Sequence, residues 1–320
     1  MAERSPPLSV IVPATNLPPT LGAVCAALRP QLLEGDELVA ITQAPGPGPG
    51  WARNHGAADA RGEVLVFVDA DVVVAPDALA RIRRAFAVES DLVAVFGAYD
   101  SHPAASDLVS GFRNLLHHHV HVAAAGPALT FWAGLGAIRR ADFEAVGGFD
   151  VERFREPSIE DVELGMRISD RGGKIVLDPA ICGTHLKRWT LRSMLVTDFA
   201  KRGVPWVRLL SERRGAAAAA AEEVAGDAEM RVLNLSRRHR AGALAAVAVA
   251  VAALARAPRA LLASLGLLVA LNAGFYRLLV ARLGARGALV GLGLHLAHHF
   301  AAVAAVPFGL AAARRGQAGR

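Results

Sequence analysis

The sequence predicts an α/β fold in which helices cover both faces of a mostly parallel sheet, followed by C-terminal transmembrane helices. Short, nearly continuous apolar runs alternate with helical patterns through the first 180 residues, as expected for parallel strands buried on both faces. The last 80 residues contain apolar stretches long enough to cross a bilayer. Hydrophobic residues make up 53% of the 320 residues, which is rich for a purely soluble enzyme.

The first elements follow one another in the order βαβαβ. Three buried strands are predicted, at residues 9–12, 37–42 and 64–68. Helical spacing covers residues 21–32 and 52–60, and the alternating Pro-Gly run over residues 44–50 predicts a loop. Ligands of such sheets bind at the carboxyl ends of the strands, so the residues that follow each strand are the first candidates for a site.

Composition divides the chain into three predicted parts. These are an α/β domain over residues 1–212, a connector with an interface helix over 213–240, and a transmembrane domain over 241–320. The apolar stretches of the last part cover residues 241–255, 260–281 and 287–313. The second and third are long enough to span a bilayer and the first is marginal, which predicts two to three spans. A soluble helical bundle is the alternative, but it would need polar outer faces that these stretches hardly have.

The net charge of +6 does not indicate a nucleic-acid partner. Residues 241–320 contain eight arginines and no Asp, Glu or Lys, so the first 240 residues carry about −2. The basic residues therefore flank apolar segments, as in membrane proteins. The two cysteines, Cys25 and Cys182, lie far apart without a CxxC pattern and indicate free thiols in a reducing compartment. The N-terminus has no apolar run long enough for a signal peptide.

The strongest local motif is Asp69-x-Asp71, directly after the predicted strand at residues 64–68. Two carboxylates at the end of a buried strand suit a hard divalent cation such as Mg²⁺ or Mn²⁺, which also takes oxygens from substrate phosphates. The alternative is a pair of solvated acids at a strand end. The βαβαβ pattern before the motif favours the site.

Six motifs in this order resemble the family 2 glycosyltransferases of the GT-A fold over residues 9–210. They are Val10-Ile11-Val12-Pro13-Ala14-Thr15-Asn16, Ala52-Arg53-Asn54-x-Gly56, Asp69-x-Asp71, Phe131-Trp132-Ala133-Gly134 with Arg139-Arg140, Gly147-Gly148-Phe149-Asp150 and Glu160-Asp161. The resemblance implies a metal-dependent enzyme that uses Mg²⁺ or Mn²⁺ and takes a sugar from a UDP- or GDP-linked donor.

On the donor side, the resemblance implies nucleotide-sugar contacts from Pro13, Ala14, Asn16, Arg53, Asn54, Asp69, Lys187 and Arg188. The guanidinium of Arg53 is suited to a charge-assisted contact with the diphosphate, and its alternative is a surface helix position. Residues 41–44 depart from the family, most members of which carry an acidic cluster that contacts the base. The identity of the base is therefore open.

The resemblance further implies that Asp161 is the catalytic base, with Glu160 orienting it or contacting the acceptor. A base must lie where it can take the proton of the acceptor hydroxyl. Ser158 is predicted to cap the helix that begins here. The alternative for both acids is that they complement the helix dipole.

For the metal, the resemblance implies Asp71 and His185, because imidazole is a suitable ligand for Mn²⁺. The alternative for His185 is a hydrogen-bonded structural histidine. On the acceptor side it implies Trp132 and Gly134, with a buried core tryptophan as the alternative. The run His117-His118-His119-x-His121 has no acidic or cysteine partner nearby, so packing is favoured over a metal site.

The tail resembles that of a membrane-bound bacterial subgroup in Leu233-Asn234-Leu235-Ser236, Tyr276-Arg277 and the histidines His295, His298 and His299. With the arginines that precede residue 241, this implies a multi-pass protein of the bacterial cytoplasmic membrane whose catalytic domain is cytoplasmic. The expected function is inverting transfer to a membrane-associated lipid or glycolipid acceptor. The alternatives are an inactive nucleotide-sugar-binding membrane scaffold and a nucleotidyltransferase, which would need a lysine-containing phosphate loop that the first 60 residues lack.

Overall fold

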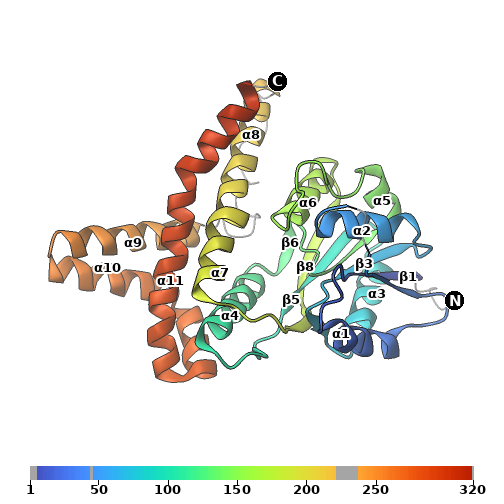
Figure 1. Cartoon of the computed structure of the whole chain (residues 1–320), viewed down its shortest axis with the longest axis horizontal. Coiled ribbons are helices and arrows are strands. Elements are labelled where there is room, and N and C mark those ends of the chain that lie inside the picture. The colour runs from blue at the N-terminus through green and yellow to red at the C-terminus, as the bar shows by residue number, and fades with distance from the viewer. Residues whose placement is uncertain (1–5, 44–45, 221–236, 319–320) are drawn as a thin grey trace. The chain divides into compact units, whose positions relative to one another are not determined.

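A computed structural model describes residues 6–43, 46–220 and 237–318 (Figure 1). Internal contacts divide the chain into two compact units. The first unit comprises residues 1–105 and 120–187, and the second comprises residues 106–119 and 188–320. The second unit therefore begins earlier than the predicted boundary at residue 212 and includes the start of one helix, α4 (Leu108–Ala123).

The first unit contains an α/β sheet whose first three strands pair in parallel in the order β2-β1-β3. These strands, β1 (Leu8–Pro13), β2 (Glu37–Ile41) and β3 (Val64–Val68), confirm the three predicted ones. The predicted helices are present as α1 (Leu21–Leu28), which continues as a 3-10 turn (η1, Arg29–Gln31), and α2 (Pro49–Ala58). The expected loop over residues 44–50 is wrong at its end, because Pro49 is a favourable first residue for a helix.

The other half of the sheet contains both parallel and antiparallel pairs. The order of strands in the whole sheet is β2-β1-β3-β7-β5-β8-β4. Its strands are β4 (Val72–Val74), β5 (Leu92–Tyr99), β7 (Leu135–Arg139) and β8 (Lys174–His185), and β6 (Gly126–Ala128) pairs with β8. The helices of this half are α3 (Ala78–Val88), α5 (Arg140–Ala145) and α6 (Glu160–Asp170). Strand β7 runs antiparallel between β3 and β5, so parallel pairing is limited to β2-β1-β3 and β5-β8.

The second unit is helical. After α4 it contains α7 (Leu191–Val196), a π-helix (η2, Thr197–Gly203), α8 (Val204–Ala220), α9 (Arg237–Leu254), α10 (Pro258–Leu271) and α11 (Ala273–Ala318). Helices α9 and α10 form a hairpin, and α11 packs along α8 (Figure 1). The backbone of α11 breaks at Gly284, whose φ of 71° lies in the left-handed region.

Among the described helices, one is long and apolar enough to cross a bilayer, at residues 273–316 within α11. The predicted span over residues 260–281 is wrong as a continuous helix. Asn272 leaves the helical conformation, and its side chain donates a hydrogen bond to the carbonyl of Leu268. Helix α10 has 14 residues, or about 21 Å, which is shorter than the hydrocarbon core. Two to three spans and a multi-pass arrangement are therefore not supported. Most of the predicted interface helix, with residues 233–236, lies outside the described residues.

Candidate active site

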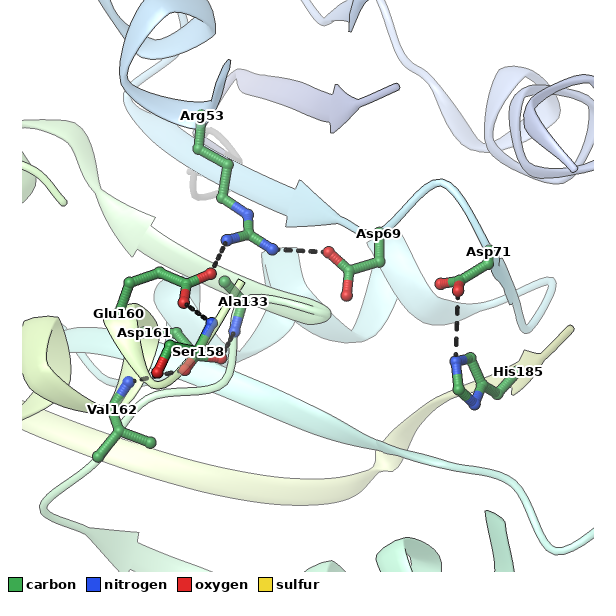
Figure 2. A network of polar contacts seen from close by, with 9 residues as sticks. All are labelled: Arg53, Asp69, Asp71, Ala133, Ser158, Glu160, Asp161, Val162 and His185. Atoms are coloured by element: carbon green, nitrogen blue, oxygen red, sulfur yellow. Dashed lines mark hydrogen bonds and ion pairs between the residues drawn. The ribbon is translucent and has the colours of Figure 1, made fainter. Parts of the chain in front are cut away.

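The Asp69-x-Asp71 motif forms a tight turn between β3 and β4. The amide of Asp69 donates to the carbonyl of Gly134 at 3.0 Å, and the amide of Val72 donates back to the carbonyl of Asp69 at 3.0 Å. Strand β4 pairs antiparallel with β8, which sets Val72 opposite His185. The sheet thereby brings together the two predicted metal ligands, with His185 Nε2 at 3.5 Å from Asp71 Oδ2 (Figure 2).

Asp71 is partly exposed and lies beside the buried His185. Burial alone would raise the pKa of Asp71, but the hydrogen bond and charge of His185 and the charge of Lys187 outweigh it and hold this pKa below its usual value. The pKa shift favours the ionised form of Asp71, and 33% of its side chain is exposed. The ring of Tyr99 stacks on His185 with centroids 4.2 Å apart and fixes its plane.

Within the described ranges, no three His, Cys, Asp or Glu side chains are arranged to hold a metal ion. Two protein ligands nevertheless fit Mg²⁺ or Mn²⁺ when substrate phosphates complete the coordination, which is the usual arrangement for Mg²⁺ in phosphate-transfer sites. The donor set of one ionised carboxylate and one imidazole suits Mn²⁺.

Arg53 connects the turn after β3 to the start of α6. Its guanidinium Nη2 lies 2.7 Å from Asp69 Oδ1, and its Nη1 lies 3.0 Å from Glu160 Oε1 (Figure 2). Its side chain is only 4% exposed, so the alternative of a surface helix position is wrong. The ring of Phe149 lies 5.3 Å from the guanidinium carbon. The Phe149 backbone is in turn held by Asn54, which bonds both its amide and its carbonyl at 2.8 Å.

Burial and the neighbouring charge of Asp71 raise the pKa of Asp69 above its usual value, although Arg53 opposes this rise. Burial alone would lower the pKa of Arg53, but the charges of Asp69 and Glu160 outweigh it, so Arg53 remains a cation. Asp69 and Glu160 are 31% and 7% exposed, and a buried carboxylate without this partner would be costly.

Glu160 and Asp161 form the first turn of α6. The predicted cap by Ser158 is wrong, because the N-cap residue is Ile159 and no side chain caps the helix. The Glu160 carboxylate instead accepts a hydrogen bond from the amide of Ser158 at 2.9 Å. Asp161 accepts from the amides of Ala133 at 3.1 Å and Val162 at 2.8 Å. Burial and then the charge of Glu160 raise the pKa of Asp161 to about 6, a value suited to a general base near neutral pH.

The segment Trp132-Ala133-Gly134 binds the Asp161 carboxylate and the backbone of Asp69. The amide of Ala133 binds Asp161, and the carbonyl of Gly134 accepts from the amide of Asp69. A Cβ on Gly134 would lie 2.4 Å from the Trp132 ring, so only glycine fits there. The buried Trp132 ring meets Tyr99 and His121 edge-on, with centroids 4.9 and 5.1 Å apart.

The predicted base-binding residues lie at the carboxyl end of β1. Ala14 is buried and its amide donates to the carbonyl of Ile41 at 2.9 Å. Asn16 and Leu17 follow with φ of 74° and 48° and are exposed. Thr20 Oγ1 donates to the carbonyl of Ala70 at 2.6 Å and so ties this loop to the Asp69-x-Asp71 turn.

Not every predicted site residue lies near the Asp69-x-Asp71 turn. Lys187 is exposed close to Asp71, whose pKa it lowers, whereas Arg188 belongs to the second unit. In the run at residues 117–121, His121 is buried and its Nδ1 lies 2.9 Å from the carbonyl of Gly97. Sequence reasoning missed Tyr99, for which no motif gave a signal. It also missed the contact of Phe149, although this residue lies in a quoted motif.

Comparison with known proteins identifies the family and the fold of the chain. The family model described as glycosyl transferase family 21 matches residues 52–283. The chain is also similar to the solved mannosyltransferase PcManGT from Pyrobaculum calidifontis, in complex with GDP-Man and Mn²⁺, with a TM-score of 0.52 and 18% identity over 94% of this chain and 88% of that one.

A second solved structure, glucosyl-3-phosphoglycerate synthase from Mycobacterium tuberculosis, in complex with Mn²⁺ and UDP-glucose, has a TM-score of 0.43 and 18% identity over 66% of this chain and 79% of that one. No curated protein matches the sequence. The expected GT-A glycosyltransferase fold is confirmed, and the matching family is family 21, where the motifs had suggested family 2. The chain belongs to glycosyl transferase family 21.

Proposed function

We propose that this glycosyltransferase transfers a sugar, with inversion, from a nucleotide-diphosphate donor to a lipid-linked acceptor at the cytoplasmic face of a membrane. The observation that carries this proposal is the continuous network from the donor-side turn to the base. Asp69 binds Arg53, Arg53 binds Glu160, and Asp161 follows with a pKa of about 6. A base near neutral pKa, rigidly connected to a cation-binding turn, is what a single displacement requires.

On the donor side, the loop at Pro13, Ala14 and Asn16 would hold the nucleobase and ribose, and Asp71 with His185 would hold the divalent ion. Bound there, Mg²⁺ or Mn²⁺ supplies Lewis-acid neutralisation of the leaving diphosphate. Lys187 and Arg188 are proposed to contact the diphosphate. The solved mannosyltransferase, which shares the fold, was obtained with GDP-Man and Mn²⁺ and supports a donor of this class.

Arg53 has a positioning role beside the expected diphosphate contact. Each of its Nη atoms binds one carboxylate, so we assign it to positioning Asp69 and Glu160. Asn54 supports it by fixing Phe149 beneath the guanidinium.

On the acceptor side, the oxygen of the acceptor hydroxyl bonds to the anomeric carbon while Asp161 accepts the proton of that hydroxyl. The bond from this carbon to the diphosphate breaks at the same time, and the electron pair leaves with the diphosphate. The hydrogen bonds from Ala133 and Val162 orient the Asp161 carboxylate. Trp132, which is 9% exposed, is proposed to form part of the wall on the acceptor side. A membrane acceptor is supported by the apolar helix at residues 273–316.

The test replaces Asp161 with Asn in the full chain. Transfer from a nucleotide sugar to a lipid extract should be abolished, while thermal stabilisation by the nucleotide sugar with Mn²⁺ should remain. The matched control is Asp91→Asn, the same change at a residue that is 72% exposed, which should leave transfer intact. Undiminished transfer by Asp161→Asn would disprove the base assignment. An inactive scaffold would instead bind the donor but transfer nothing even as wild type.

A further inference from the structure

The π-helix and α8 pack against α11 through small residues in the second unit. A Cβ on Gly203 would lie 2.6 Å from the Cβ of Ala305, and a Cβ on Gly309 would lie 2.5 Å from the Cβ of Val207. Two glycines from opposite helices thus allow the backbones to approach closely, as in helix pairs of membrane proteins.

Beside this contact the same helices enclose a groove of about 300 Å³, the lower end of the size range of ligand sites. Its wall includes Phe199, Ala200 and Val204 from one side and Phe308 and Ala311 from the other, and its single charged lining residue is Arg315. The alanines leave the room that larger side chains would fill. Phe308 lines the groove and is still 60% exposed, so the apolar wall is open to the surroundings.

The charged residue that lines this groove is a cation. Arg208 and Glu212, which both lie near Gly316, form an ion pair at 2.7 Å. Arg315 is exposed, and no carboxylate among the described residues pairs with it. The whole segment 241–320 contains no Asp or Glu. An occupant of the groove therefore needs an apolar chain joined to an anionic group.

We propose that the groove binds an acyl chain of an anionic phospholipid, with the phosphate of that lipid at Arg315. Free phosphate would not use the apolar wall, and a second copy of α11 would bring the same arginines and no carboxylate to Arg315. An arginine contributes about 1 kcal/mol of attraction to an anionic lipid surface, which corresponds to about a fivefold change in dissociation constant. The site belongs to the second unit and does not depend on the transfer chemistry.

The experiment uses the full chain in a neutral maltoside detergent, with the melting temperature as readout. The probes are phosphatidylglycerol and phosphatidylcholine with identical acyl chains, and glycerol 3-phosphate as the headgroup without a chain. Phosphatidylglycerol should stabilise the wild type at the lowest concentration, phosphatidylcholine should need about fivefold more, and glycerol 3-phosphate should have no effect. Asp161→Asn should respond like the wild type, which separates this proposal from the proposed function.

Two kinds of variant locate the site. Arg315→Gln should weaken phosphatidylglycerol binding about fivefold, to the level of phosphatidylcholine, whereas the control Arg314→Gln removes the same charge from the neighbouring exposed residue and should not. Ala311→Phe and Ala200→Leu fill the groove from opposite walls and should remove the response to both lipids. Arg315→Gln alters an exposed side chain, so it tests the proposal even if a filled groove prevents folding.

Four outcomes would overturn the proposal. Equal responses of the wild type to the two lipids would exclude recognition of charge. Stabilisation by glycerol 3-phosphate alone would indicate a simple anion site. An equal loss in Arg314→Gln and Arg315→Gln would indicate diffuse attraction rather than this groove. A dimer that forms without lipid and is disrupted by Ala311→Phe would identify a second copy as the occupant.

Discussion

Replacing Arg53 with Met should destabilise the protein chiefly by leaving two carboxylates without their cation. Removing one partner of a buried ion pair costs about 3–5 kcal/mol. Glu160 is 7% exposed and bears the full effect, whereas Asp69 is 31% exposed and keeps part of its hydration, so we expect a loss near 3 kcal/mol. For a unit of about 170 residues, this corresponds to a melting temperature lower by about 6–12 °C.

The assay is thermal unfolding at several pH values, because the loss of the cation beside Asp69 predicts the sign of the pH dependence. The pKa of Asp69 already lies above its usual value, and removing Arg53 raises it further. A carboxylate with a raised folded pKa destabilises the protein above that pKa, and this penalty disappears as the pH falls through it. The difference between Arg53→Met and the wild type should therefore shrink from pH 8 to pH 5.

Two further variants separate charge from packing. Arg53→Lys keeps a cation and should lose less stability than Arg53→Met. Glu160→Gln should destabilise the wild type but recover stability in the Arg53→Met background, because it removes a carboxylate that has lost its partner. A loss that is constant with pH and not relieved by Glu160→Gln would refute the charge argument. It would point to the lost contact with Phe149 instead.

Three other predictions follow from the site. The rate of transfer should fall tenfold per pH unit below about pH 6, as Asp161 becomes protonated, and a flat kcat profile between pH 5 and 7.5 would contradict its role as base. Asp71→Asn should abolish the part of the stabilisation by nucleotide sugar that depends on Mn²⁺ and leave any metal-free nucleoside binding unchanged. Thermal shift in the presence and absence of EDTA measures this, and a retained metal dependence would remove Asp71 from the ligand set. Gly134→Ala should lower the melting temperature and the activity, since its Cβ would lie 2.4 Å from the Trp132 ring. Gly22→Ala, with open space around its Cβ, should do neither, and equal effects of both changes would refute the steric argument.

Local patterns predicted the elements that depend on nearby residues. The run at residues 64–68 forms β3, which is buried between β1 and β7, and Asp69 and Asp71 follow at its carboxyl end. The antiparallel insertion of β7 was not predictable, because strand pairing is a long-range choice that the apolar pattern of residues 135–139 does not encode.

The sequence predicted candidate site residues that lie within one motif, but it did not predict contacts between segments that are distant in the sequence. Arg53 and Glu160 are 107 positions apart, and their ion pair depends on how α2 and α6 pack. The error at Ser158 has a similar origin, because the Glu160 side chain reaches back to the backbone that a cap would have served. At residues 260–281, the mean hydropathy is high throughout and therefore did not indicate that helix α10 ends before Asn272.

The backbone of Ala133 and Gly134 has a consequence for how acceptor preference can diverge. Two adjacent residues hold Asp161 on one side and the turn of Asp69 on the other, so covalent geometry limits the spacing between the proposed base and this turn. Side chains at position 132 are not part of that spacing. If Trp132 lines the acceptor as proposed, substitutions that fit against Gly134 should change which acceptor is accepted while leaving the spacing between Asp161 and the Asp69 turn unaltered. The substrate range could then drift without rebuilding the catalytic centre.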